Sequence, residues 1–291
     1  MKQLLTPKQV ARAIGVSESS LKRWCDQGRI PTTRTAGGHR RLPISGVMQF
    51  LRSSDYQLVQ PEVLGLPSTT GQGPRVLDRA TDALTEALLA GNEPLCRQIT
   101  IDLYLAEHRM SSICDHVIGP AFHRVGENWD CGEIEIYRER RSCEICERLI
   151  HELRLAIPPL EETAALALGA TPEGDPYRLP TMLVELVLLE NGWRATSLGT
   201  SLPFDTLRAA VMENHPRLFW LSATTIRDED NFLADYQRFY DEFGDQMAIV
   251  VGGQAITTQL RRKMQYAAYC DTIQHMESFV SSLDKASSGK D

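Results

Sequence analysis

The chain of 291 residues is 42% hydrophobic, which suits two or three globular domains and excludes a disordered protein. It contains no run of about 18 apolar residues, and a polar helix follows the first residues directly, so we expect a cytoplasmic protein without an export or membrane segment. Its seven cysteines are scattered and odd in number, which predicts reduced thiols rather than a disulfide framework.

The net charge of −7 is unevenly distributed along the chain. Residues 1–55 contain ten lysines or arginines and three acidic residues, for a net charge of +7, so that the remaining 236 residues carry −14. A basic segment attached to an acidic body is typical of a protein that binds a polyanion. We therefore expect residues 1–55 to form a domain that binds double-stranded DNA.

Two short helices are predicted within this basic segment. Thr6 and Pro7 are typical of a helix start, and the helix is expected to end at Gly15. A second helix is expected from Ser17 to Gly28, because its apolar residues recur at helical spacing. Two helices joined by such a tight turn make a helix-turn-helix, whose second helix can enter a major groove.

A two-stranded wing is predicted from Arg34 to Arg41, with its turn at the two glycines of "TAGGHRRLP". The pattern "LTPKQVARAIGVSESSLKRWCDQGRIPTTRTAGGHRRL" resembles the N-terminal winged-helix domain of MerR-family transcription regulators, although Leu42 stands where that family usually has an aromatic residue. The side chains expected to contact the groove or the DNA backbone are Ser19, Ser20, Lys22, Arg23, Arg34, His39, Arg40 and Arg41.

Two further segments precede the last domain. Residues 56–74 are rich in proline and glycine and lack basic residues, which predicts a flexible linker and a mobile head. Residues 75–158 show helical periodicity in four stretches, which predicts a four-helix bundle. The last of these stretches contains Cys143 and Cys146, but without further ligands nearby in sequence the pair is weak evidence for zinc, and we expect no metal site.

Strands and helices alternate over residues 162–286. The expected strands are 164–170, 194–200, 217–224 and 246–255. This alternation predicts an α/β Rossmann-like domain, a doubly wound parallel sheet with ligands beyond the carboxyl ends of its strands. The expected fold is thus multidomain, with an α winged helix-turn-helix head, a four-helix bundle and the Rossmann-like sheet.

This order of domains resembles the cobalamin-dependent, light-sensing branch of the MerR regulators, the CarA, CarH and LitR group. The group shares a cobalamin signature with methionine synthases and mutases: Asp-x-His-x-x-Gly, a long gap, Ser-x-Leu or Thr, a shorter gap and Gly-Gly. The chain keeps this frame at Asp175, at Ser222 with Thr224, and at Gly252 with Gly253.

Within this frame, the residue at the position of the cobalt ligand differs from that of the group. The resemblance implies that Tyr177 stands where the group has the histidine that binds the lower face of cobalt, and that Pro180 replaces the glycine of the same motif. A phenol, whose pKa is about 10, is a poor cobalt ligand at neutral pH, whereas a neutral imidazole is a good one.

The bundle also lacks histidines at positions where the group has them. Trp129 matches the tryptophan that caps the upper face of the cofactor, but Asp130 stands where a second cobalt-binding histidine is expected. Glu139 and Arg140 stand in place of a Glu-His pair. One interpretation is that the remaining residues of the frame simply fill a core that once surrounded a cofactor.

We therefore expect a DNA-binding transcriptional regulator, of the repressor kind, that acts as a homo-oligomer (dimer or tetramer) and senses without cobalamin. One alternative is a regulator that responds to light or a ligand by binding cobalamin base-off, and another is a sensor of a different tetrapyrrole such as haem or a bilin. A third is control by a protein partner, and a fourth is an enzyme, for which the chain has no evident catalytic group.

Overall fold

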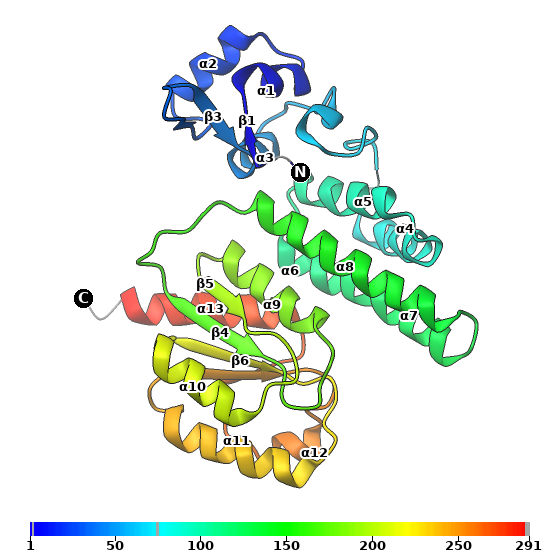
Figure 1. Ribbon diagram of the computed structural model, residues 1–291, viewed down its shortest axis with the longest axis vertical. Coiled ribbons are helices and arrows are strands. Elements are labelled where there is room, and N and C mark those ends of the chain that lie inside the picture. The colour runs from blue at the N-terminus through cyan, green and yellow to red at the C-terminus, as the bar shows by residue number, and fades with distance from the viewer. Residues whose placement is uncertain (2, 74–75, 289–291) are drawn as a thin grey trace. The chain divides into compact units, whose positions relative to one another are not determined.

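The computed structural model describes residues 1, 3–73 and 76–288, and it divides into two compact units, Met1–Pro159 and Leu160–Asp291 (Figure 1). The first unit holds a helix-turn-helix head and a helical bundle, and the second holds a parallel sheet flanked by helices. Within the described ranges, no helix combines the length and the apolar character that crossing a bilayer requires.

The head is built from short helices and a small antiparallel sheet of order β1-β3-β2. Thr6 begins the first helix in a capping box with Gln9, and Ser17 caps the second by accepting the N–H of Ser20. Leu42 is fully buried beneath the wing, so leucine fills the position expected for an aromatic residue. The elements are β1 (Leu4–Leu5), α1 (Pro7–Ala13), α2 (Glu18–Asp26), β2 (Thr33–Arg34), β3 (Arg40–Pro43) and α3 (Ile44–Arg52).

Residues 59–73, here called the clasp, return to the head after α3 and include the 3₁₀ helix η1 (Pro61–Leu64). The N–H groups of Val59 and Gln60 donate to the carbonyl oxygen of Ala13 at 2.8 and 3.0 Å. Arg12 Nε donates to Gln60 Oε1 at 2.6 Å. The first residues of the clasp are therefore fastened to the end of α1.

The other end of the clasp is fastened to the bundle by a buried carboxylate. Gly71 N–H donates to Asp102 Oδ1 at 2.5 Å and Gly73 N–H to Asp102 Oδ2 at 2.7 Å, while Asp102 is only 1% exposed. The structure thus shows a packed segment where composition predicts a flexible linker over 56–74. The physical reason is that Asp102, which lies 29 residues beyond Gly73 and 31 beyond Gly71, supplies acceptors that the linker's own sequence does not reveal. Residues 74 and 75, where the linker was expected to meet the bundle, lie outside the described residues.

Arg52 joins the head to the bundle directly. Its Nη2 donates to the carbonyl oxygens of Glu107 and His108 at 3.1 and 2.9 Å, and its guanidinium lies 4.5 Å from the ring centroid of Tyr104. These carbonyls follow the end of a bundle helix, where a cation is favoured. The first unit is therefore held together by both the clasp and α3.

The bundle has the predicted helical stretches, with one difference in the third. There α6 (Met110–Ile113) and α7 (Gly119–Asp130) are joined by a π-helical turn, η2 (Cys114–Ile118). Pro120 follows this turn and has no N–H to donate back into it, which favours an irregular turn at this point. The other helices are α4 (Leu77–Ala90), α5 (Glu93–Leu105) and α8 (Ile136–Ala156).

The second unit is a parallel sheet of order β5-β4-β6-β7-β8 among the described residues. Helices α9 and α13 cover one face and α10, α11 and α12 the other, as the two buried clusters and Figure 1 show. The edge strand β8 was not predicted from the sequence. The strands are β4 (Leu166–Ala170), β5 (Arg194–Ser197), β6 (Leu218–Ser222), β7 (Ala248–Gly252) and β8 (Ala268–Cys270). The helices are α9 (Leu179–Glu190), α10 (Phe204–Asn214), α11 (Glu229–Phe243), α12 (Thr258–Arg261) and α13 (Ile273–Ser288).

The clasp predicts a stability difference between two aspartate variants. Asp102→Ala leaves two N–H groups of the clasp without their acceptors and should lower the free energy of unfolding by about 2 kcal/mol in urea titrations. Thermolysin should then cleave the clasp faster, near the buried Leu64 and Leu66.

Asp82→Ala is the matched control, because Asp82 makes an exposed ion pair with Arg124 and its loss should change stability by less than about 1 kcal/mol. Equal protection of the clasp in both variants would show that the Asp102 carboxylate does not hold it.

Candidate functional site

The helix α2 presents a polar face away from the core of the head. Leu21 and Trp24 are buried on its inner face, whereas Ser19, Lys22 and Arg23 are exposed. The hydroxyls of Ser19 and Ser20 each lie 2.9 Å from the Ser17 hydroxyl, so all three gather in the first turn. Lys22 pairs with Glu18 at 2.9 Å within the same helix. This face has the character of a recognition helix, with short polar groups at its amino end and cations beyond.

The wing places its basic side chains beside α2. Arg34 and Arg40 are partners in the antiparallel pairing of β2 and β3, and Gly38, with φ of +77°, makes the turn between them. Arg34 and His39 are exposed and Arg41 is half-buried. The predicted DNA-contacting residues of the wing and of α2 therefore belong to one folded domain.

Arg40 has a second partner that sequence reasoning missed. Its Nη2 donates to Asp26 Oδ1 at 2.6 Å, and its Nη1 donates to the carbonyl oxygen of Lys22 at 3.3 Å. Both acceptors belong to α2, so Arg40 fixes the wing against this helix. Whether it also touches DNA stays a prediction, as for the other residues of this face.

The candidate residues of the bundle lie around the hairpin between α7 and α8. Trp129 is 40% exposed and Asp130, the last residue of α7, is also exposed. Glu139 is buried in the first turns of α8, where it accepts from Cys143 Sγ at 3.2 Å and lies 3.4 Å from Arg140 Nε. Glu139 therefore contacts its own helix, while Trp129 leaves much of its ring open.

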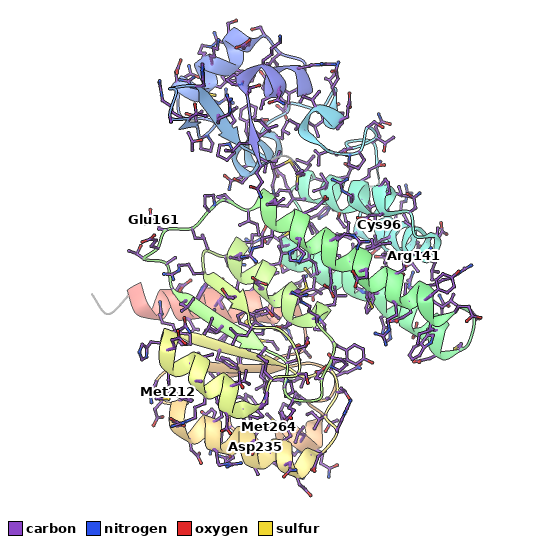
Figure 2. The ribbon with its side chains drawn as sticks, in the orientation of Figure 1. Cys96, Arg141, Glu161, Met212, Asp235 and Met264 are labelled. Atoms are coloured by element: carbon purple, nitrogen blue, oxygen red, sulfur yellow. The ribbon has the colours of Figure 1, made fainter. Side chains whose placement is uncertain are left out.

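Three cysteines of the bundle, Cys96, Cys143 and Cys146, are withdrawn from solvent. Burial raises the pKa of Cys143 to about 12, with a further rise from Glu139, and burial also raises the pKa of Cys96 to about 12. Figure 2 marks Cys96 on α5. Burial raises the pKa of Cys146 as well. Across the described part of the chain, no group of three or more His, Cys, Asp or Glu side chains is arranged to hold a metal ion.

In the sheet domain, Asp175 ties together the loops that follow β4 and β6. Its carboxylate is fully buried and accepts the N–H of Tyr177 at 3.0 Å on Oδ1. Its Oδ2 accepts the N–H groups of Thr224 and Thr225 at 2.6 and 3.3 Å. The Tyr177 side chain, by contrast, is 42% exposed. The first and second parts of the predicted frame thus meet, with Thr225 as a partner that the sequence did not indicate.

The glycines of the frame lie against the chain's own backbone. A Cβ on Gly253, whose φ is +101°, would collide with the carbonyl oxygen of Ala223, and one on Gly252 would collide with that of Cys270. Ser222 pairs with Gly252 in the sheet and is only 5% exposed. These residues therefore pack neighbouring strands and loops together.

Two family models match this chain. A model described as a helix-turn-helix domain matches residues 4–55, and one described as a B12 binding domain matches residues 80–154, which form the bundle. The HTH-type transcriptional repressor CarA of Myxococcus xanthus is 25% identical over 270 residues, covering 87% of this chain and 88% of CarA. The repressor CarH of the same organism is 26% identical over 175 residues, covering 60% of this chain and 57% of CarH.

The chain is CarA/CarH-like. Its predicted resemblance to this group is therefore confirmed, and it carries a helix-turn-helix domain and a module that matches a B12 binding domain. Among solved structures, the monomethylamine corrinoid protein of Methanosarcina barkeri matches with a TM-score of 0.60 at 16% identity, over 72% of this chain and 100% of that protein. This likeness confirms the fold of the bundle and the Rossmann-like sheet.

The residues of the CarA/CarH-like frame do not fit a corrin whose cobalt is held by protein imidazole. Residues 175–181 contain no histidine, and Tyr177 offers a phenol in its place. The Asp175 carboxylate, the one anionic group of the motif, already accepts three backbone N–H groups. The neighbouring loop is thus braced by the chain itself, and no step of the function is assigned to cobalt.

The head predicts distinct effects for its wing arginines. Arg34→Ala and Arg41→Ala should each weaken DNA binding and lower the slope of log affinity against log salt by about 1, because each removes one cation that is predicted to contact a phosphate. Fluorescence anisotropy across a salt series measures both quantities. Arg262→Ala, at an exposed arginine of the second unit, is the matched control and should change neither.

Variants of Arg40 test both the predicted DNA contact and the contact between the wing and α2. Arg40→Ala should also weaken DNA binding, and Asp26→Ala should reproduce part of that loss because it frees the wing from α2. The wing assignment is wrong if a double Arg40→Ala, Arg41→Ala variant keeps the affinity and the salt slope of the unaltered protein.

Proposed function

We propose that this chain is a transcriptional repressor whose cobalamin-type module controls DNA binding without histidine-ligated cobalamin. The observation that carries the proposal is the combination of an exposed basic head with Tyr177 and the engaged Asp175 at the position of the cobalt-binding motif. The repressor assignment is supported by the names of its relatives CarA and CarH. The same likeness supports a regulator rather than an enzyme.

DNA binding by this head is proposed to require a homo-oligomer. A single winged helix presents one recognition helix, and regulators of this kind gain affinity by placing two or more heads on repeated or palindromic half-sites. Repression then follows when the occupied operator blocks polymerase. The bundle and the sheet domain supply the surfaces for self-association in this proposal.

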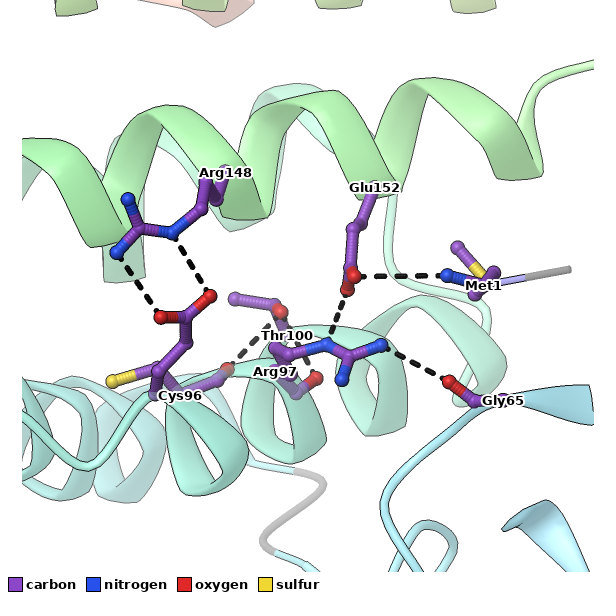
Figure 3. Close-up of polar contacts among 8 residues, drawn as sticks. Met1, Gly65, Cys96, Arg97, Thr100, Arg148 and Glu152 are labelled. Carbon is purple, nitrogen blue, oxygen red and sulfur yellow. Dashed lines mark hydrogen bonds and ion pairs between the residues drawn. The ribbon is translucent and has the colours of Figure 1, made fainter.

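The bundle is proposed to set the orientation of the head through a network of charged groups (Figure 3). Arg97 of α5 donates from Nε to Glu152 of α8 at 2.6 Å and from Nη2 to the carbonyl oxygen of Gly65 in the clasp at 3.1 Å. Glu152 also lies 3.7 Å from the amine of Met1. A shift of α5 against α8 therefore pulls on the clasp and on the head together.

A second candidate function is favoured by one observation on the bundle. Trp129 is 40% exposed, and an exposed aromatic residue at the position of the group's capping tryptophan suits a planar ligand. On this alternative the chain is a light- or ligand-responsive regulator that binds cobalamin base-off, haem or a bilin. A coloured protein after purification would favour it.

One experiment separates the two candidates. The purified protein is incubated with adenosylcobalamin, passed through gel filtration and examined by its visible spectrum, and its binding to labelled fragments from upstream of its own gene is measured in the dark and under green light. We expect a colourless protein that binds one fragment specifically, with equal affinity under both conditions, because no imidazole holds cobalt.

A double Lys22→Ala, Arg23→Ala variant should lose this binding, whereas Arg262→Ala should retain it. A red protein with stoichiometric cofactor whose DNA affinity falls under green light would contradict the proposal. Failure of the unaltered protein to prefer any fragment over unrelated DNA would contradict the regulator function itself.

A further inference from the structure

We infer that the ligand crevice of the sheet domain is filled by the chain's own Trp220, so that it has no space for the nucleotide tail of a corrinoid. This inference rests on the proposed function and extends it from the cobalt ligand to the rest of the cofactor. In open parallel sheets, ligands bind beyond the carboxyl ends of the strands, at the point where the strand order reverses. Here that point lies between β4 and β6, the strands from which the chain continues in opposite directions.

Trp220 lies two residues before the carboxyl end of β6, on the face of the sheet that α9 and α13 cover. It is paired in register with Gly169 across β4 and β6, and it is 1% exposed. Its indole ring lies over Gly169 so closely that any Cβ at that position would overlap the ring. Glycine at 169 and tryptophan at 220 are therefore complementary, since the missing side chain of one is the space that the other fills.

The indole is also held in position by one hydrogen bond to α9, outside the sheet. Its Nε1 donates to Thr181 Oγ1 of α9 at 2.9 Å, and Thr181 is fully buried. The Thr181 hydroxyl lies 3.2 Å from the hydroxyl of Ser197 at the end of β5. Moving the ring away would leave the buried indole N–H without an acceptor, which is unfavourable. The hydrogen bond to Thr181 therefore keeps the ring where it is.

The mouth of the crevice is closed by a second set of contacts. Asp175, in the loop after β4, accepts the N–H groups of Thr224 and Thr225 in the loop after β6. Backbone N–H groups at such a loop are the donors that a ligand's phosphate would use. The chain's own carboxylate accepts from these donors and the ring of Trp220 takes the space for a ligand ring. Because the frame shares this aspartate with the cobalamin-binding group, the ring of Trp220 is the feature that distinguishes this chain.

A corrinoid tail carries both of these features, a benzimidazole ring and a phosphate. The structure therefore disfavours base-off cobalamin as well as imidazole-ligated cobalamin, although the fold belongs to a corrinoid-binding type. The sheet domain acts as a closed scaffold in this inference, and any signal enters the protein elsewhere.

The test compares two buried tryptophans of the same cluster. Trp193, also 1% exposed, directly precedes β5 at the amino end of the sheet, away from the crevice mouth. Trp220→Ala opens space at the carboxyl end, and Trp193→Ala opens a similar space at the amino end. The probes are adenosylcobalamin, cobinamide, which lacks the tail, and free 5,6-dimethylbenzimidazole.

We expect 5,6-dimethylbenzimidazole to raise the melting temperature of Trp220→Ala, but not that of Trp193→Ala or the unaltered protein, because a dry cavity near the mouth admits a ring of this size. An equal response of all three proteins would overturn the inference. Tyr177→His keeps the folded core, since Tyr177 is exposed, and tests the same point without a cavity. It should stay colourless with adenosylcobalamin after gel filtration, because the imidazole is restored but the space is not.

Retention of adenosylcobalamin by the unaltered protein or by Tyr177→His would overturn the filled crevice. Retention of cobinamide but not of adenosylcobalamin would support it, while contradicting the cobalamin-independent function. DNA binding is measured on the same samples, so failure of the regulator function is seen separately from the outcome at the crevice.

Discussion

A buried carboxylate is unfavourable by several kcal/mol unless hydrogen bonds compensate its lost hydration. Asp175 meets that requirement with three backbone N–H groups from two loops. The loops after β4 and β6 are consequently held to one another at the point where parallel sheets usually admit a ligand. The local arrangement of the candidate site depends on this interaction, because the frame residues adjoin one or the other of these loops.

The first unit uses the same device for a different purpose. Asp102 accepts the N–H groups of Gly71 and Gly73, and it is as deeply buried as Asp175. Glycine loses more conformational freedom on folding than any other residue, so ordering this segment needs strong acceptors. A charged acceptor provides stronger hydrogen bonds than a neutral one. The clasp thus becomes part of the folded unit rather than a tether, and the head and bundle share one body.

Much of this architecture was predictable from local signals. The caps at Thr6 and Ser17, the glycine turn of the wing and the alternation of strands and helices are short-range features, and each lies where the sequence placed it. The edge strand β8 was missed because three residues are too few to show a period. The clasp and the Arg40 contact to Asp26 were missed because their partners are distant in sequence, and no periodicity reports such pairs.

Trp220 shows why a site is harder to predict than a fold. In the sequence it belongs to the apolar run "LFWLS", which indicates a buried strand and nothing more. Only its register opposite Gly169 reveals that a large ring fills the space left by a missing side chain. The residues of the cobalamin signature give no information on the volume that the Trp220 ring fills. Tyr177 in place of histidine removes one bond to cobalt, whereas Trp220 fills the space that the nucleotide tail of a corrinoid would need. Of these two differences the second is the stronger physical barrier, because a base-off cofactor can do without a protein ligand but cannot share a volume with an indole ring.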